Sequence, residues 1–418
     1  MAASMVTSGG GSKKRKHEQS TPELGHLHED MLERVLARLP PASFFRLRGV
    51  CRRWRDAAGS PAFLAACASV PARDPWFLML SERQDERRPP IAFDAAERTW
   101  ARCRGAPGPG PVPVAAAGGL VLYRAADTGA LTVANPLTGA SRALPPPPPA
   151  TLQAVAMYGS PYRVVLILGK LTDLSMSTFD PSTNTWSFPV PLSRKPDPNA
   201  SPATTDAPTP RGNNNEDDDE DADADDDGTV FFLTKSGTVI SSTTERSPSR
   251  EHSSAVTCGP NGSNPVAYFL SGSGAVVSCD LASRLFSELP RVLPVPSEHS
   301  IDVAACGGRA YAVVLTEYLD TASLRVWEFL EGAWAQAAAM PPAMSHGFFG
   351  AKADVNCVGH GRRIMVCVSS SGEANGSFLC DVANNRWEEL PRCADGGDGA
   401  AADFVASFSF EPRMEVAV

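Results

Sequence analysis

The residue patterns that most often carry catalysis do not occur in this chain of 418 residues. A phosphate-binding loop needs G-x-x-x-x-G-K followed by Ser or Thr, and many serine hydrolases place their nucleophile in G-x-S-x-G. Neither pattern is found, and Gly272-Ser273-Gly274 is better interpreted as a hairpin turn. Acidic pairs exist, but spacing in the sequence cannot place two carboxylates at the separation that glycosidases require. The sequence therefore predicts no catalytic residue.

The histidines and cysteines form no metal-binding pattern. None of the ten Cys belongs to a C-x-x-C pair, and the seven His are scattered over His17, His26, His28, His252, His299, His346 and His360. The N-terminus has no apolar core of the kind found in a secretory signal, and no apolar run of about 20 residues could cross a membrane. We therefore predict reduced, packed thiols, no metal site and no cofactor.

One acidic segment accounts for the net charge of −9, because residues 216–227 hold ten Asp or Glu in twelve positions. The rest of the chain is nearly neutral and lacks the basic surface that nucleic-acid binding needs. Around this run, residues 193–228 are rich in Pro and Asn and are predicted to be a disordered insert. We interpret the run as solvated, with weak calcium binding and contact with a basic partner as the alternatives.

The N-terminal residues 1–23 contain almost nothing apolar and are predicted to be a disordered tail. Within this tail four basic residues are consecutive: Lys13, Lys14, Arg15 and Lys16. Such a run on a flexible segment indicates a nuclear-import signal, with a solvated charge run as the alternative. We expect a nuclear protein, with the cytoplasm as a second location.

Residues 24–68 predict a small helical domain. An apolar stripe with helical spacing is formed by Met31, Leu32, Val35, Leu36 and Leu39. Pro40-Pro41 ends the first helix, a second apolar series runs from Phe44 to Trp54, and Ser60-Pro61 opens a third helix. Three short helices cannot bury this much apolar surface among themselves, so part of it should contact another surface.

From Trp76 onward short apolar runs alternate with turns, which predicts an all-β domain over residues 75–418. In a recurring motif, an acidic residue or Asn is followed six positions later by an aromatic, and often then by Leu-Pro or Met-Pro. The motif occurs at Asp94…Trp100, Asp180…Trp186, Asp280…Phe286, Glu328…Trp334 and Asp381…Trp387, with a degenerate copy at Asn135…Ser141. The acidic side chain can bond its own turn, and the aromatic ring can pack between neighbouring sheets.

The copies of this motif start 41, 45, 100, 48 and 53 residues apart. A period of roughly 40–50 residues with four short strands per unit favours a β-propeller. The interval of 100 residues contains the acidic insert and leaves room for a degenerate blade near residues 229–242. The sequence therefore predicts six or seven blades.

The two domains together resemble the plant F-box/kelch-type proteins. The helical segment is similar to an F-box at Leu27-His28-Glu29-Asp30-Met31-Leu32 and at Val50-Cys51-Arg52-Arg53-Trp54, although His28 stands where the family usually has Pro. The β domain is similar to that family at Asp381-Val382-Ala383-Asn384-Asn385-Arg386-Trp387 and at Phe410-Glu411-Pro412-Arg413. The resemblance covers residues 24–418 apart from the acidic insert.

This resemblance implies a non-catalytic substrate-receptor subunit of a Skp–cullin–F-box ubiquitin ligase. The F-box would dock on the Skp adaptor, and through it on a cullin, while the propeller would bind an unidentified target protein. The candidate adaptor-binding residues are Leu27, Met31, Leu32, Val35, Leu36, Leu39, Pro40, Val50 and Trp54, of which some must form the core of the F-box itself. Arg52 and Arg53 either meet acidic groups of the adaptor or lie on a solvated face.

The substrate-binding residues are unknown, with the loops at 259–265, 317–323 and 344–350 as candidates. A second hypothesis is a nuclear co-regulator that uses the same two domains without causing degradation. A third is an enzyme with its active site in the propeller. Some kelch-type propellers are copper oxidases, but no matching set of Tyr and His ligands can be assembled here.

Overall fold

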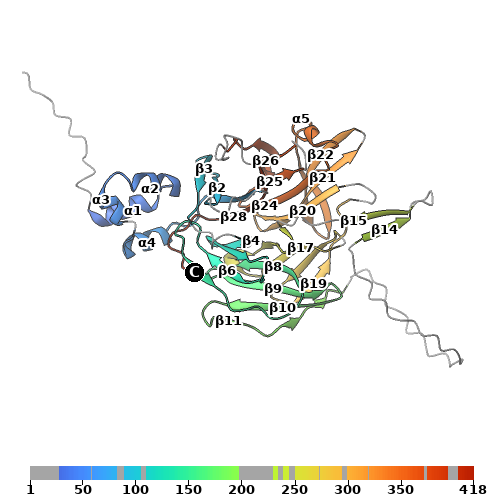
Figure 1. Ribbon diagram of the computed structural model, residues 1–418, viewed down its shortest axis with the longest axis horizontal. Coiled ribbons are helices and arrows are strands. Elements are labelled where there is room, and N and C mark those ends of the chain that lie inside the picture. The colour runs from blue at the N-terminus through green and yellow to red at the C-terminus, as the bar shows by residue number, and fades with distance from the viewer. Residues whose placement is uncertain are drawn as a thin grey trace, which may run out of the picture.

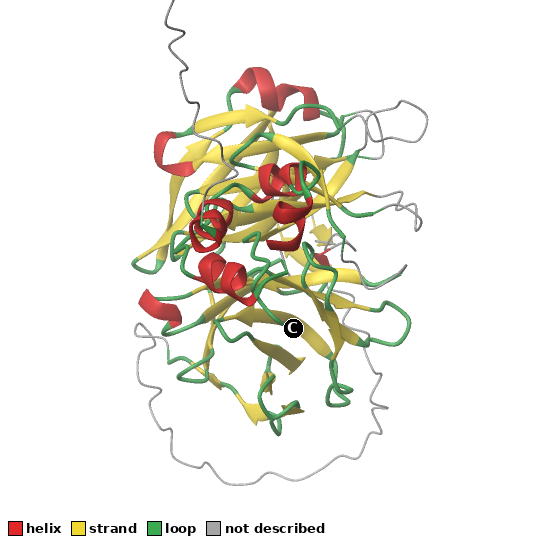
Figure 2. Ribbon diagram, turned by 90° about the vertical axis from the view of Figure 1, so that its left-hand side faces the viewer, coloured by secondary structure: helices red, strands yellow, loops and turns green. Residues whose placement is uncertain are grey.

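A small group of helices lies beside a large all-β domain (Figure 1). The structure is a computed structural model that describes residues 28–57, 59–81, 89–104, 110–196, 229–233, 239–243, 250–272, 274–293, 299–318, 320–370, 374–393 and 403–418. Viewed from their side of the molecule, the helices stand in front of the sheets (Figure 2). The predicted N-terminal tail with its basic run, Leu27 and residues 197–228 of the predicted insert lie outside the described residues.

The N-terminal module contains four helices where three were predicted. They are α1 (Glu29–Ala37), α2 (Pro41–Leu47), α3 (Arg52–Ala57) and α4 (Pro61–Ala68). The apolar series from Phe44 to Trp54 is split between α2 and α3, because Gly49 and the β-branched Val50 are poor helix formers. The period of the apolar residues continues across this break, so the sequence pattern alone did not reveal it.

The helix boundaries follow from local chemistry. Pro41 opens α2, where a missing backbone N–H has no cost. Ser60 caps α4, since its hydroxyl accepts a hydrogen bond from the backbone N–H of Phe63 at 2.9 Å. The side chains of Phe44 and Phe63 stack in the module core with ring centroids 5.0 Å apart.

The all-β domain is a propeller of six blades, and each blade is one sheet. Blade 1 contains β28 (Phe404–Phe410), β1 (Trp76–Ser81), β2 (Ile91–Asp94) and β3 (Thr99–Arg102); blade 2 contains β4 (Val112–Ala117), β5 (Leu120–Arg124), β6 (Leu131–Ala134) and β7 (Ser141–Ala143); blade 3 contains β8 (Leu152–Tyr158), β9 (Arg163–Lys170), β10 (Asp173–Asp180), β11 (Thr185–Trp186) and β12 (Val190–Pro191). Blade 4 contains β16 (Ala255–Thr257), β17 (Val266–Leu270), β18 (Val276–Asp280), β19 (Leu285–Glu288) and β13 (Ser193–Arg194); blade 5 contains β20 (His299–Cys306), β21 (Arg309–Tyr318), β22 (Thr321–Leu330) and β23 (Ala333–Ala339); blade 6 contains β24 (Asp354–His360), β25 (Arg363–Ser369), β26 (Gly376–Asp381) and β27 (Arg386–Glu389).

The last strand of the chain closes the ring. β28 is the innermost strand of blade 1 and pairs antiparallel with β1, with Trp76 opposite Phe410. The innermost strands of neighbouring blades then contact one another in a closed series, β28–β4–β8–β16–β20–β24–β28. Loss of either end of the propeller would therefore open the ring.

The hydrophobic core is divided into separate clusters between adjacent blades. Phe77 and Met79 of blade 1, for example, pack against Met365 and Cys367 of blade 6. A corresponding cluster lies between the two blades of each of the five remaining neighbouring pairs. Both faces of each sheet are thus covered by neighbouring blades. For this reason the strand sequences are short apolar runs and do not strictly alternate between apolar and polar residues.

The described residues of the interval of 100 residues form no seventh blade. β14 (Thr229–Leu233) and β15 (Val239–Thr243) pair only with each other, as a two-stranded sheet. Before it, β13 crosses to blade 4 and runs parallel to β19, with Ser193 opposite Leu285. This pairing gives blade 4 a fifth strand. A hairpin has the same alternation of apolar runs and turns as half a blade, so the sequence could not separate six blades from seven.

The recurring motif forms the outer turn as predicted in blades 1, 2, 3, 4 and 6, whereas in blade 5 Glu328 lies within β22 and its carboxylate pairs with Arg309. Asp94 Oδ1 accepts hydrogen bonds from the backbone N–H groups of Ala96 and Glu97 at 2.9 and 3.0 Å. Asn135 accepts the equivalent bonds in blade 2, which explains how this degenerate copy keeps the turn. Arg98 has a φ of 55°, and this left-handed residue returns the chain toward the aromatic position.

Candidate protein-interaction surfaces

The apolar residues proposed for adaptor binding divide into a buried and an exposed group. Leu32 and Leu36 are each 1% exposed and belong to the core of the helical module. Leu39 and Trp54 are half-buried and pack against the same core. The sequence indicated that some of the set must form the core but could not assign them, because one helical stripe contains both kinds of residue.

The exposed group contains Met31, Val35 and Val50, which are 57%, 48% and 68% exposed, together with the exposed Pro40. Met31 and Val35 are four residues apart in α1 and therefore share one face of that helix. Val50 lies in the break between α2 and α3. Several exposed apolar side chains on so small a domain are typical of a surface that a partner covers.

The charge of the helical module is positive. Residues 28–68 contain seven Arg and only four Asp or Glu. Arg52 and Arg55 of α3 are exposed, close in sequence to the exposed Val50. This combination of apolar and basic side chains favours a partner with an apolar centre and acidic groups around it.

Helix α2 attaches the module to the propeller. The hydroxyl of Ser43 donates to the Glu97 carboxylate in the turn after β2, and Arg46 Nη2 lies 2.9 Å from Glu97 Oε2. Phe45 packs against the core between blades 1 and 2, with the Arg104 guanidinium 5.7 Å from its ring centroid. The attachment combines one half-buried aromatic residue with charged hydrogen bonds, so the module has a defined position on the propeller.

Two arginines hold the connection between the domains. Arg73 donates to the carbonyl oxygens of Ala37 and Leu39, at 2.6 and 3.2 Å, where α1 ends. Arg413, just after the last strand, donates to the carbonyl oxygens of Val70 and Pro71, at 3.2 and 2.8 Å.

The Arg413 side chain is itself fixed by two carboxylates. Its Nε lies 2.7 Å from Glu411 Oε2 and its Nη1 lies 3.0 Å from Glu415 Oε1. The residues after β28 therefore bind the linker to the propeller, and we call residues 411–418 the C-terminal clamp. Asn135 Nδ2 in blade 2 supports this clamp by donating to the Arg413 carbonyl oxygen at 2.9 Å.

An arginine fills the centre of the propeller. Arg250 is 8% exposed and donates from Nε to the Ser253 hydroxyl at 2.8 Å and from Nη1 to the Ser407 carbonyl oxygen at 3.0 Å. Its guanidinium lies 4.9 Å from the ring centroid of Phe408, and Nε lies 3.8 Å from Asp302 Oδ2. Burial raises the pKa of Asp302, while Arg250 opposes this shift.

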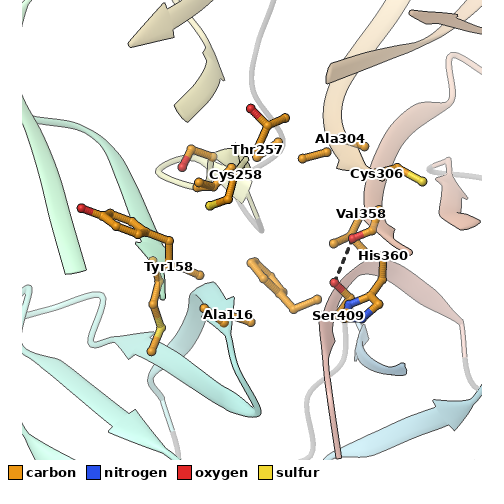
Figure 3. Close-up of a pocket in the computed structure, with 18 of the residues that line it drawn as sticks. Ala116, Tyr158, Thr257, Cys258, Ala304, Cys306, Val358, His360 and Ser409 are labelled. Atoms are coloured by element: carbon orange, nitrogen blue, oxygen red, sulfur yellow. Dashed lines mark hydrogen bonds between the residues drawn. The ribbon is translucent and has the colours of Figure 1, made fainter. Parts of the chain in front are cut away.

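A cavity of about 300 Å³ opens at one end of the central channel, where the innermost strands finish (Figure 3). We call this the helix-side end. Trp76 pairs with Asp94, close to the α2 contact at Glu97, and also with Phe410, the last residue of β28. The C-terminal end of β28 therefore lies on the side of the propeller that carries the helices. The lining includes Tyr158, Cys258 and His360. Glycine turns such as Gly118 and Gly159 leave the mouth open.

Burial shifts the pKa values of two groups that line the cavity. Burial raises the pKa of Cys306 to about 11, so its thiol is protonated and weakly nucleophilic at neutral pH. Burial lowers the pKa of His360, whose Nε2 lies 4.0 Å from Glu411 Oε1. Across the ranges that the structure describes, no group of three His, Cys, Asp or Glu could hold a metal ion, and no helix is long and apolar enough to cross a bilayer.

The three candidate substrate loops do not share one face. The loop at 259–265 follows the innermost strand of blade 4, at the helix-side end. The loops at 317–323 and 344–350 meet at the opposite end, where Glu317 Oε2 accepts a hydrogen bond from the Gly350 N–H at 3.1 Å. Phe349, in the second of these two loops, is 41% exposed.

A helical module of this kind followed by a six-bladed propeller defines the class of F-box/β-propeller proteins. A family model for the F-box domain matches residues 24–65. The chain is 37% identical to F-box only protein 13 of Arabidopsis thaliana over an alignment of 411 residues. This alignment covers 94% of this chain and 85% of that protein. The chain belongs to the plant F-box proteins that carry a β-propeller.

Two further relatives from Arabidopsis thaliana are more distant. F-box only protein 6 is 22% identical over 87% of this chain and 69% of its own length. An F-box/kelch-repeat protein is 30% identical over 38% of this chain and 44% of its own length. F-box proteins with propellers fit the role of substrate receptors in Skp–cullin–F-box ligases, and as a class they are non-catalytic subunits.

Sequence reasoning did not find the C-terminal clamp or the central arginine. The Phe410-Glu411-Pro412-Arg413 ending was noticed only as a family resemblance, and its role depends on contacts with residues more than 300 positions away. Arg250 follows the insert without any repeat or spacing that marks it. The polar residues Glu251 to Ser254 separate it from β16, so the sequence carries no signal of its burial.

Proposed function

We propose that this protein is a substrate receptor of a Skp–cullin–F-box ubiquitin ligase. In this role it binds the Skp adaptor through its helical module and presents a target protein on its propeller. It contributes binding and orientation, and the ubiquitin-transfer chemistry belongs to its partners. The observation that carries this proposal is the separation of the F-box apolar residues into a core around Leu32 and Leu36 and an exposed set, Met31, Val35 and Val50.

The exposed set is the proposed adaptor contact. Full burial of such a side chain contributes about 1.5–3 kcal/mol relative to full exposure, and these three, which are 57%, 48% and 68% exposed, would contribute the part that the adaptor newly covers. The basic residues of α3 are suited to acidic groups on the adaptor. The buried residues Leu32 and Leu36 and the half-buried Trp54 act indirectly, by keeping the helices in place.

The C-terminal clamp and the α2 contact give the receptor a fixed geometry. A ligase receptor must hold its target at a constant position relative to the adaptor, and Arg73 and Arg413 fix the linker that joins the two domains. We further propose that residues 13–16 direct the protein to the nucleus. This part of the proposal depends on the sequence alone.

Target capture distinguishes a degradative receptor from a passive scaffold. Wild type and a Met31→Asp/Val35→Asp variant would be expressed in plant cells with and without a proteasome inhibitor, and bound proteins would be quantified. A degradative receptor predicts partners that accumulate on the variant and reach the same level on wild type only when the proteasome is inhibited. Equal recovery in all four samples would contradict a degradative role.

A further inference from the structure

The connection between blades 2 and 3 contains five consecutive prolines, at residues 145–149. A proline ring fixes its own φ near −65°, and each proline also restricts the residue before it to extended ψ values. Consecutive prolines therefore form a polyproline II helix, with three residues per turn and about 3.1 Å of rise per residue. Five such residues make a rigid rod of roughly 15 Å.

The rod is fixed to the propeller at both ends. Before it, Leu144 is buried between blades 2 and 3, and its backbone N–H donates to the Leu131 carbonyl oxygen at 2.8 Å. The first carbonyl of the rod, Pro145 O, accepts the indole N–H of Trp186 at 2.9 Å. After it, Thr151 O accepts the Gly169 backbone N–H at 2.9 Å. The conformation is thus prepared before any partner arrives.

Exposure along the rod follows the period of the polyproline II helix. Pro146 and Pro149 are exposed, while Pro147 and Pro148 between them are half-buried. Residues three apart lie on one edge of a helix with three residues per turn. The surface therefore displays two proline rings in a row along one edge, in the P-x-x-P arrangement that polyproline-binding modules recognise.

We propose that the prolines at 145–149 form a docking ridge for a protein module with a polyproline-binding groove lined by aromatic side chains. Such grooves stack Trp and Tyr rings on proline and donate hydrogen bonds from indole and phenol groups to proline carbonyls. The ridge needs little ordering on binding, which lowers the entropic cost of association.

The charges near the prolines restrict which kind of partner groove can bind them. The nearest cation, Arg142, donates to Asn184 Oδ1 at 2.8 Å and to Pro181 O at 3.5 Å, so it is engaged within the propeller. Recognition must then depend on ring stacking and carbonyl hydrogen bonds. A purely aromatic groove fits this ridge better than one with an acidic pocket for a flanking arginine. This partner is separate from the adaptor and from the ligase target, and the inference does not depend on the proposed function.

The test uses isotope-labelled profilin, whose aromatic groove binds oligoproline, and measures its NMR shifts during titration with the full chain. The inference predicts shifts confined to the groove, reversal by a decaproline peptide, and affinity lowered at least about tenfold by Pro146→Ser/Pro149→Ser. Pro260→Ser/Pro341→Ser, which alters two exposed prolines in other turns, should bind as wild type does.

A thermal melt would establish that both double variants remain folded. If the ridge variant does not fold, the decaproline competition on wild type still decides the question. Shifts outside the groove, or shifts that decaproline does not reverse, would overturn the inference. It would also be overturned if a profilin that binds free decaproline did not respond to the wild-type chain.

Discussion

The indole Nε1 of Trp100 donates a hydrogen bond to the carbonyl oxygen of Pro391 at 3.0 Å, across the junction where the first blade meets the last. The same relationship joins Trp186 to Pro145 at 2.9 Å and Trp334 to Pro290 at 2.7 Å. In each case the aromatic of the recurring motif bonds to the Leu-Pro segment that ends the preceding blade. The two recurring parts of the repeat, the aromatic residue and the Leu-Pro segment, are thus the two halves of one contact between blades.

Replacement of Trp100 by Phe should weaken the closure of the ring. The ring stays aromatic, but Pro391 O loses its donor, and a net loss of about 1 kcal/mol in the free energy of unfolding is expected. Chemical denaturation monitored by circular dichroism would measure it. Trp387→Phe is the matched control, because Trp387 Nε1 donates to Asn385 within its own turn. Equal destabilisation by the two variants would argue against a contribution from the contact between blades.

The blade turns should make stability depend on acid pH. The Ser182 hydroxyl lowers the pKa of Asp180, and the Asn384 side chain lowers that of Asp381, by donating to the carboxylates. A lowered folded-state pKa stabilises the fold above the unfolded value of about 4, and this stabilisation is lost as pH falls through the folded pKa.

An Asp180→Asn/Asp381→Asn variant should therefore show a shallower loss of unfolding free energy between about pH 4 and pH 2 than wild type. Asn can keep the turn bonds, as Asn135 does in blade 2. Urea titrations at several pH values would measure the slope. An unchanged slope would show that these carboxylates are not the groups responsible.

The contributions of Arg250 and Asp302 to the free energy of unfolding should depend strongly on one another. Arg250→Met leaves the buried carboxyl group of Asp302 without its cationic partner, and a loss of roughly 3–5 kcal/mol in unfolding free energy is expected. Asp302→Asn should destabilise through the same pair and through its bond from the Cys357 N–H. In the double variant the losses should be clearly less than additive, which a double-mutant cycle in urea would show. Additive losses would mean that the two side chains stabilise the channel independently.

Removal of the Arg413 side chain should make the position of the F-box relative to the propeller more variable without unfolding the F-box. Arg413→Ala eliminates the bonds to Val70 and Pro71, so the distribution of positions of the module should broaden. Spin labels on the exposed Cys51 and on Ala282→Cys in blade 4, in a Cys258→Ser background, would report this distance by pulsed electron resonance.

Arg194→Ala is the control for that measurement, since Arg194 pairs with Glu288 at the surface of blade 4, away from the linker. The control should keep the wild-type distance distribution. An unchanged distribution in Arg413→Ala would show that α2 alone positions the module. A weaker Skp interaction is not expected for either variant, because neither side chain belongs to the exposed apolar set.

The sequence predicted the two domains and the blade turns because these depend on local chemistry. Asp94 bonds its own turn, and Ser60 caps its own helix, within three residues. It did not determine the number of blades, because a free hairpin at β14–β15 has the same pattern as part of a blade. It also could not pair β28 with β1, since this pairing joins the two ends of the β domain.

In the F-box, the sequence could not show which apolar residues are buried and which are exposed. The apolar positions could be recognised, but Leu32 and Met31 are adjacent in sequence while one is 1% and the other 57% exposed. Which of them points inward depends on how α1 packs against α4. A Leu32→Asp variant would therefore test folding, and only substitutions in the exposed set test binding.

We propose that the exposed apolar residues of the helical module bind the Skp adaptor. Isothermal titration of a purified Skp adaptor into wild type and into Met31→Asp/Val35→Asp tests it directly. We expect binding by wild type and an affinity at least about 100-fold lower for the variant, since two buried aspartates would each lack a partner. Phe188→Asp, at a side chain 91% exposed on blade 3, should bind as wild type does. Absence of binding by the folded wild-type chain, or equal binding by the double variant, would contradict the account.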